Sequence, residues 1–210
     1  MIKVKICGVT NVDDAMLVTN LGAEFIGLNL FKDSPRKVSV AMAKDIISKL
    51  PPFIIPVGIF VDEDIQVLAK TAKKCGFKMI QLHGSETPEY CKQVTELTQL
   101  PIIKAIRVKD ESSLETIPQY KDAVKYILLD AFVEGEAGGT GESFNWDLAL
   151  KAVDLGIPIF LAGGLTPENV EEAIEKVRPF AVDTSSGVER LQRKKDYEKM
   201  KTFIRNARGI

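Results

Sequence analysis

The chain has little histidine, with a single residue of this type, and it carries no marked excess of either charge. Its 28 Lys and Arg residues nearly balance 29 Asp and Glu residues, which is not typical of a nucleic-acid-binding protein. No apolar run approaches the roughly 18 residues that a membrane helix needs, and the first residues lack the zones of a signal peptide. We therefore expect a cytoplasmic protein with no nucleic-acid and no membrane partner.

Cysteine is also scarce. Cys7, Cys75 and Cys91 are an odd number and form no Cys-x-x-Cys pair, so the sequence indicates neither a disulfide framework nor a zinc site. We expect three free thiols, with Cys75 and Cys91 packed in the interior. With His83 as its only histidine, the chain also cannot supply the several histidine ligands of a metal-dependent pentose-phosphate epimerase.

The sequence does contain a regular alternation of short β-branched runs and helical periodicity. Its 210 residues, 45% of them hydrophobic, can bury a substantial core. Strands are predicted at 4–7, 25–30, 54–60, 79–82, 102–107, 126–129, 159–161 and 180–182. Helices are predicted at 13–21, 40–50, 64–75, 88–97, 146–155, 167–177 and 196–208, with a weaker pattern at 112–120. This alternation predicts an α/β fold, a (β/α)8 TIM barrel that forms one domain over residues 1–210.

A doubly wound open sheet is the alternative arrangement of alternating strands and helices. Such sheets usually have fewer strands, and the first predicted strand is not followed by Gly-x-Gly-x-x-Gly. Capping signals support the predicted helix starts. Thr10 precedes Asp13 at the spacing of a capping box, and Thr87 and Thr166 each precede a proline suited to the first helical position.

The active site of such a barrel is built from the loops that follow the carboxyl ends of its strands. Glycines there let backbone N–H groups approach an anion, and the loops after strands seven and eight often bind phosphate. The glycines and serines in these positions are Gly139 and Gly141 after strand six, Gly163 and Gly164 after strand seven, and Ser185 and Ser186 after strand eight. Gly163-Gly164 alone could form a tight turn, but its pairing with the neighbouring serines favours a phosphate-ester ligand.

Two ionisable residues end predicted strands. Cys7 precedes a glycine turn at the barrel mouth, where a helix end or a cation could lower its pKa from about 8.5 towards neutrality. It could then act as a base, or it could be an inert core thiol. Asp130 follows an apolar strand, so its carboxyl group could be partly desolvated, keep its proton and act as a general acid, or it could cap the loop.

Two further candidates lie in the same set of loops. Arg36 follows Ser34-Pro35 and offers a planar fork suited to a carboxylate, although most arginines are solvated surface residues. His83 could line the pocket or be hydrogen bonded at the end of its strand.

Short motifs follow one another in a specific order along nearly the whole chain. They are Lys5-Ile6-Cys7-Gly8, Ser34-Pro35-Arg36, 57–61, Gln81-Leu82-His83-Gly84, Leu129-Asp130 with 138–141, 161–165 and 185–189. In this order they resemble the phosphoribosylanthranilate isomerase family of tryptophan biosynthesis. The chain departs from the family pattern at Arg193, which occupies a usual glycine, and at Thr184, which replaces an apolar residue. The turn into the last helix is therefore expected to differ.

The resemblance implies an Amadori rearrangement of N-(5-phosphoribosyl)anthranilate, a phosphorylated aminoaldose, to 1-(2-carboxyphenylamino)-1-deoxyribulose 5-phosphate, with no metal and no cofactor. It implies Asp130 as the general acid that opens the ribose ring and Cys7 as the general base at C2. For binding it implies Arg36 at the anthranilate carboxylate, the loops of Gly163, Gly164, Ser185 and Ser186 at the phosphate, and Asp183 and His83 as further pocket residues. The chain would act as a monomer or a homodimer.

Two other functions remain open. A barrel of this kind could bind a phosphorylated ligand as a regulator, without catalysis. The analogous isomerase of the histidine pathway acts on another aminoaldose phosphate, but it uses two aspartates, whereas the first strand here ends in Cys7.

Overall fold

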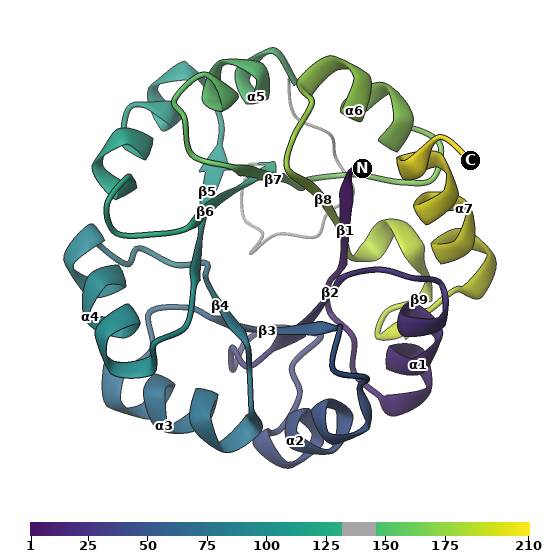
Figure 1. Cartoon of the computed structure of the whole chain (residues 1–210), viewed down its shortest axis with the longest axis horizontal. Helices are drawn as coiled ribbons and strands as arrows, with labels where there is room; N and C mark the ends of the chain where they lie inside the picture. Colours follow the sequence, from purple (N-terminus) through teal and green to yellow (C-terminus); the bar gives the residue numbers. More distant parts are fainter. Residues whose placement is uncertain (132–145) are drawn as a thin grey trace.

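A computed structural model describes residues 1–131 and 146–210 of the chain. Its centre is a closed barrel of parallel strands that follow one another in sequence order, which confirms the predicted (β/α)8 barrel and excludes the open sheet (Figure 1). The barrel strands are β1 (Lys3–Ile6), β2 (Phe25–Asn29), β3 (Ile55–Phe60), β4 (Met79–Leu82), β5 (Ile102–Val108), β6 (Tyr126–Ala131), β7 (Ile159–Leu161) and β8 (Ala181–Thr184). A small antiparallel hairpin follows β8, formed by β9 (Glu189–Leu191) and β10 (Lys194–Lys195).

The helices surround the barrel, so that each strand is covered from outside (Figure 1). They are α1 (Val12–Asn20), α2 (Val40–Lys49), α3 (Ile65–Cys75), α4 (Pro88–Thr98), α5 (Trp146–Val153), α6 (Val170–Val177) and α7 (Tyr197–Arg208). Between β5 and β6 the weak helical pattern forms two short 3-10 helices instead, η1 (Glu111–Leu114) and η2 (Ile117–Tyr120). Pro118 lies in this segment and disfavours a continuous helix, because it lacks an N–H and restricts the residue before it.

The three predicted capping signals have different outcomes. Thr87 is the N-cap of α4 and accepts a hydrogen bond from the Tyr90 N–H, as predicted. Thr10 does not cap α1, because Asn11 takes that position and accepts from the Asp14 N–H. The prediction for Thr166 is also wrong: the residues after it form a turn, and α6 begins only at Val170.

Two apolar clusters hold the described part of the fold together. The larger one lies between the outer surface of the barrel and the helices, and the smaller one fills the inside of the barrel. At the amino ends of the strands, Phe25 and Tyr126 each pack edge-to-face on Phe160, and Phe180 stacks on Tyr126 with a centroid separation of 5.0 Å. Such pairs are worth about 0.5–1.5 kcal/mol beyond their buried area. We call these four packed rings the aromatic floor of the barrel.

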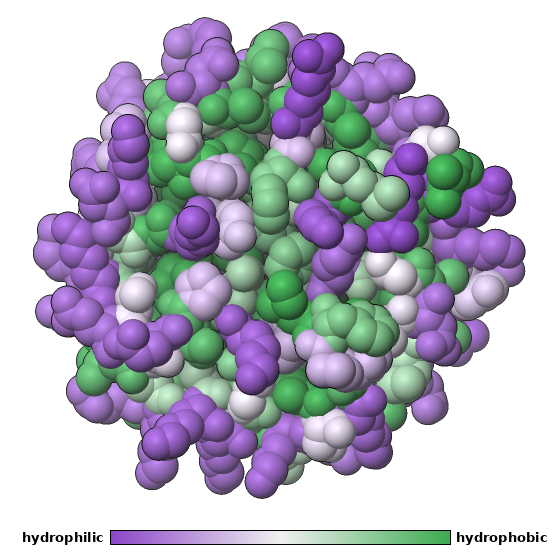
Figure 2. Space-filling model, in the orientation of Figure 1, coloured by the Kyte–Doolittle hydropathy of each residue, from purple (hydrophilic) through white to green (hydrophobic). Residues whose placement is uncertain are grey.

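Most of the charged side chains that the structure describes lie outside the buried core. Figure 2 shows hydrophilic side chains around the outline of the molecule, with more hydrophobic surface nearer the centre of this face. Among the helices that the structure describes, none combines the length and the apolar character needed to cross a membrane.

Candidate active site

The carboxyl ends of the strands surround a cavity of about 120 Å³, several times the space that one water molecule needs. All predicted site residues within the described part of the chain line it: Cys7, Arg36, His83, Asp130, Gly163, Gly164, Asp183, Ser185 and Ser186. Gly139 and Gly141 lie outside the described residues. The loops after the strands therefore bring the selected side chains together, as the barrel topology predicts.

Cys7 follows directly after β1 and is half-buried, with its thiol at the cavity rather than sealed in the interior. Its Sγ lies against β2 at Gly27, where a Cβ would come within 2.9 Å of the sulfur. Burial raises the pKa of the thiol above its ordinary value, and the nearby Lys5 and Lys195 cations only partly offset this effect. The expectation of a pKa lowered by a neighbouring cation is therefore wrong for the free protein, because desolvation outweighs the cations.

A buried ion pair lies beneath the thiol. Lys5 faces the same side of β1 as Cys7, and its Nζ donates a hydrogen bond of 2.9 Å to Asp183 Oδ1 on β8. Burial lowers the pKa of Lys5, but the charges of Asp183 and Cys7 outweigh it and raise the pKa overall. For Asp183, burial raises the pKa, and Asp130 acts in the same direction against the attraction of Lys5.

Asp130 lies near the end of β6, next to the only histidine. Its Oδ1 accepts a hydrogen bond from the Ala131 N–H, and its Oδ2 lies 3.3 Å from His83 Nε2. The other ring nitrogen of His83 is 2.9 Å from Gln81 Nε2. Gln81 Oε1 is buried at the same cavity without a partner among the described residues. This arrangement orients the imidazole and leaves an acceptor atom for a ligand.

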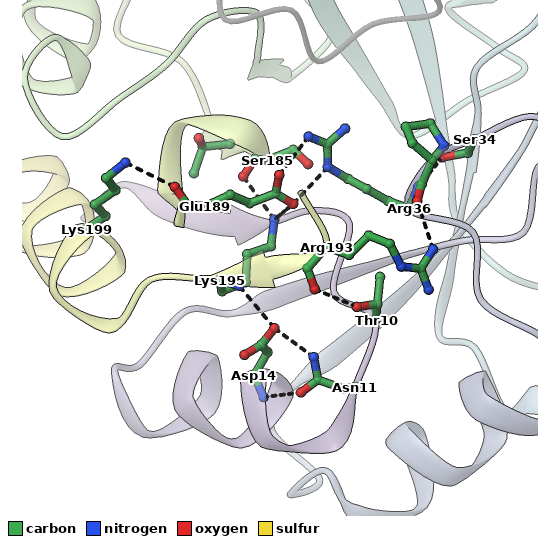
Figure 3. A network of polar contacts seen from close by, with 12 residues as sticks. Thr10, Asn11, Asp14, Ser34, Arg36, Ser185, Glu189, Arg193, Lys195 and Lys199 are labelled. Carbon is green, nitrogen blue, oxygen red and sulfur yellow. Dashed lines mark hydrogen bonds and ion pairs between the residues drawn. The ribbon is translucent and has the colours of Figure 1, made fainter. Parts of the chain in front are cut away.

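Arg36 enters the cavity from the loop after β2. Its guanidinium makes a bidentate contact with Glu189, with Nε 2.8 Å from Oε1 and Nη2 2.7 Å from Oε2 (Figure 3). This hydrogen-bonded partner raises the pKa of Arg36 above its ordinary value. Arg36 is therefore a fixed cation at the edge of the cavity and not a solvated surface residue.

The loops after β7 and β8 lie side by side at the cavity. Gly163 and Gly164 have φ values of 80° and 67°, which glycine adopts readily, and a Cβ on Gly163 would collide with the backbone of Ala131. Thr184 Oγ1 donates a hydrogen bond of 2.7 Å to the Leu165 carbonyl and so ties the two loops together. This tie explains why a polar residue is suited to the position of Thr184.

Sequence reasoning missed the residues that support the predicted ones: Lys5, Gln81, Glu189 and Lys195. Lys5 and Gln81 stand two residues before Cys7 and His83, so the alternation of side chains along a strand was the available signal. For Lys195 no signal in the sequence indicates burial. Among the described residues, no group of three or more His, Cys, Asp or Glu side chains is arranged to hold a metal ion.

The fold and the site together define the class of protein. The protein is a (β/α)8-barrel enzyme whose cavity, at the carboxyl ends of the strands, carries a thiol, a carboxyl group, an arginine and glycine-containing loops. The sequence profile of N-(5'-phosphoribosyl)anthranilate (PRA) isomerase matches residues 4–206. The chain belongs to this family of isomerases, which confirms the resemblance seen in its motifs.

Individual relatives agree over the full length. The chain is similar to the N-(5'-phosphoribosyl)anthranilate isomerase of Pelobacter propionicus, with 48% identity covering 99% of this chain and 96% of that protein. It is 46% identical to the Geobacter metallireducens enzyme, with both chains fully covered. The crystal structure of the Thermotoga maritima enzyme matches with a TM-score of 0.93 and 40% identity over all of both chains. A structure of such an enzyme in complex with reduced 1-(o-carboxyphenylamino)-1-deoxyribulose 5-phosphate matches with a TM-score of 0.90 and 40% identity, also over both full chains.

Proposed function

We propose that this chain, as one barrel domain in the cytoplasm, catalyses the Amadori rearrangement of N-(5'-phosphoribosyl)anthranilate in tryptophan biosynthesis. The product is 1-(2-carboxyphenylamino)-1-deoxyribulose 5-phosphate, and no cofactor takes part. The observation that carries this proposal is that Cys7 and Asp130, from β1 and β6, border the same cavity as the Gly163 and Ser185 loops. An acid and a base can thus reach one sugar whose phosphate is held at the loops.

Asp130 is the general acid in this proposal. It gives a proton to the ring oxygen of the ribose, the C1–O bond breaks, and the nitrogen lone pair forms the Schiff base. The Ala131 N–H holds Asp130 Oδ1, and His83 Nε2 lies 3.3 Å from Oδ2 without a hydrogen bond to it. Acid–base groups placed in this way contribute about 10²- to 10⁴-fold each.

Cys7 is the general base. It takes the proton from C2, the C–H electrons form the C1–C2 double bond, and the π electrons of the C1=N bond return to the nitrogen. The enolamine that results tautomerises to the ketone. Since burial raises the pKa of the thiol, its thiolate form depends on the Lys5 and Lys195 cations beside it. A desolvated thiolate of high pKa is also the stronger base once it forms.

Binding is divided between two sides of the cavity. Arg36 holds the carboxylate of the anthranilate ring by a charged hydrogen bond, which is typically worth about 1.5–3 kcal/mol. Backbone N–H groups of the Gly163-Gly164 loop and the Ser185-Ser186 loop hold the phosphate, and we assign Gly139 and Gly141 to the same role. Asp183 and Gln81 also line the cavity, and we assign them to the sugar.

The test is turnover of N-(5'-phosphoribosyl)anthranilate, followed by the loss of its anthranilate-type fluorescence. Cys7→Ser and Asp130→Asn are each expected to lower kcat by at least about 10²-fold and to leave phosphate affinity nearly unchanged. Unchanged turnover in either variant would remove the role assigned to that residue. Binding without turnover by the unaltered protein would favour a regulatory barrel, and faster turnover of the histidine-pathway aminoaldose phosphate would favour that isomerase.

A further inference from the structure

The guanidinium of Arg36 is already committed on one edge. Nε and Nη2 both donate to the Glu189 carboxylate, so the opposite edge, with Nη1, remains for another partner. Among the described residues, Nη1 has no hydrogen-bonded acceptor. Because a fork-to-carboxylate contact is planar and bidentate, it fixes the rotation of the guanidinium as well as its position.

Glu189 is itself held from below by a second cation (Figure 3). Lys195 Nζ lies 3.1 Å from Glu189 Oε1 and donates a 2.9 Å hydrogen bond to the Ser185 carbonyl. The side chain of Lys195 is fully buried, and that of Glu189 is only 5% exposed. Burial raises the pKa of Glu189, but its hydrogen bonds from Arg36 and the charge of Lys195 lower it overall, so the carboxylate stays charged.

The backbone around Arg36 is fixed independently. Arg193 Nη1, from the turn between β9 and β10, donates to the carbonyls of Pro35 and Lys37 at 2.8 and 3.0 Å. Arg193 has a φ of 71°, so the main chain keeps the conformation that suits the glycine usual at this position while the arginine side chain adds a contact. The hairpin after β8 thus fixes both the main chain and the head group of Arg36.

The single carboxylate of Glu189 lies between the basic groups of Arg36 and Lys195. Burial lowers the pKa of Lys195, and the charge of Glu189 acts against this effect. A buried carboxylate that neutralised Arg36 completely would weaken its attraction for an anion, and Lys195 prevents this. The arrangement is that of a cation held ready for a carboxylate ligand.

We propose that Glu189, supported by Lys195, is the positioning residue that aims Arg36 at the carboxylate of the substrate and so sets the preference for a carboxylated N-aryl group. This inference rests on the proposed function, in which Arg36 binds the anthranilate carboxylate. Glu189 itself does not touch the ligand; it acts through the guanidinium. Its loss should therefore weaken recognition of the carboxylate and not of the phosphate or the sugar.

The experiment compares two ligands by calorimetry: reduced 1-(o-carboxyphenylamino)-1-deoxyribulose 5-phosphate and its phenylamino counterpart without the carboxyl group. The unaltered protein is expected to prefer the carboxylated ligand by at least about tenfold. Glu189→Gln should reduce this preference by about fivefold or more while the Kd of the other ligand stays within about twofold. Arg36→Met should abolish the preference for the carboxylated ligand. Adding Glu189→Gln to Arg36→Met should then change neither Kd further.

A matched control and a second variant complete the design. Glu198→Gln, at a carboxylate that is 73% exposed on α7, should leave both Kd values unchanged. Glu189→Asp keeps the charge but withdraws the carboxylate by one methylene, so it should also reduce the preference for the carboxylated ligand. This variant replaces Glu189→Gln in the experiment if Glu189→Gln does not fold.

Each result has a definite meaning. Equal weakening of both ligands, or additive effects of Glu189→Gln and Arg36→Met, overturns the positioning role of Glu189. A preference that survives Arg36→Met shows that Arg36 does not bind the carboxylate, which overturns both that assignment and this inference. If the unaltered protein binds neither ligand, the proposed function itself fails.

Discussion

Gly8 offers the sharpest test of how the cavity is assembled. It follows Cys7 with a φ of 68°, and a Cβ there would lie 2.5 Å from Arg36 Cδ and 2.8 Å from Ser185 Oγ. Arg36 cannot yield easily, because Glu189 holds its guanidinium by two hydrogen bonds. Gly8→Ala should therefore displace two parts of the proposed binding site at once. These are Arg36, which is proposed to bind the substrate carboxylate, and the Ser185 loop, which is proposed to bind the phosphate.

The magnitude follows from two contributions. A left-handed conformation costs a residue with a Cβ roughly 1–2 kcal/mol, of which the stiffer unfolded chain offsets about 0.4–1 kcal/mol. Overpacking against the locked Arg36 adds about 1–3 kcal/mol. We expect Gly8→Ala to lower the free energy of unfolding by about 1–5 kcal/mol and to raise KM by at least about fivefold.

Gly156→Ala is the matched control. Gly156 has a φ of 80°, and a Cβ there would meet nothing within 4 Å, so only the backbone contribution remains. The free energy of unfolding of Gly156→Ala should fall by about 1.6 kcal/mol or less, with KM unchanged. Urea denaturation and steady-state kinetics measure both quantities. Equal destabilisation by the two substitutions, with a normal KM for Gly8→Ala, would refute the packing argument.

Two further predictions concern buried lysines. Lys5→Met should raise the pKa of Cys7 further, because it removes a cation and leaves Asp183 unpaired. Alkylation of Cys7 at pH 8, measured by peptide mass spectrometry, should then slow by about threefold or more. An equal or faster rate would contradict this prediction. Lys104→Met leaves the Glu86 carboxylate, 3.1 Å away and 1% exposed, without its cation. In urea denaturation, Lys104→Met should lower the free energy of unfolding by about 3–5 kcal/mol. Lys151→Met, at an exposed ion pair, should lower it by under about 1 kcal/mol. Similar losses in the two variants would contradict the argument from burial.

The order of strands and helices was predictable because each strand is a short apolar run bounded by turn residues. Met79–Leu82 and Ile159–Leu161 have the bounds that the sequence indicates. The helix starts were less predictable, because competing polar residues stand next to one another. Asn11 caps α1 in place of Thr10, whose hydroxyl instead donates to the Arg193 carbonyl from a distant part of the chain.

That the candidate site residues lie together was predictable from their place after strands, but their electrostatics were not. A cation beside Cys7 was expected, and Lys5 and Lys195 both supply one. Whether the pKa of the thiol is raised or lowered depends on how far burial outweighs these cations. The extent of burial follows only from the closed barrel. The contact of Arg36 with Glu189 joins residues 153 positions apart, so no local pattern indicates it.

The aromatic floor has a consequence for traffic through the enzyme. Phe25, Tyr126, Phe160 and Phe180 pack together at the amino ends of the strands, whereas the cavity lies at the opposite, carboxyl ends. We therefore expect ligands to enter and leave at the carboxyl ends of the strands, so that the product has to leave the cavity before the next substrate can bind.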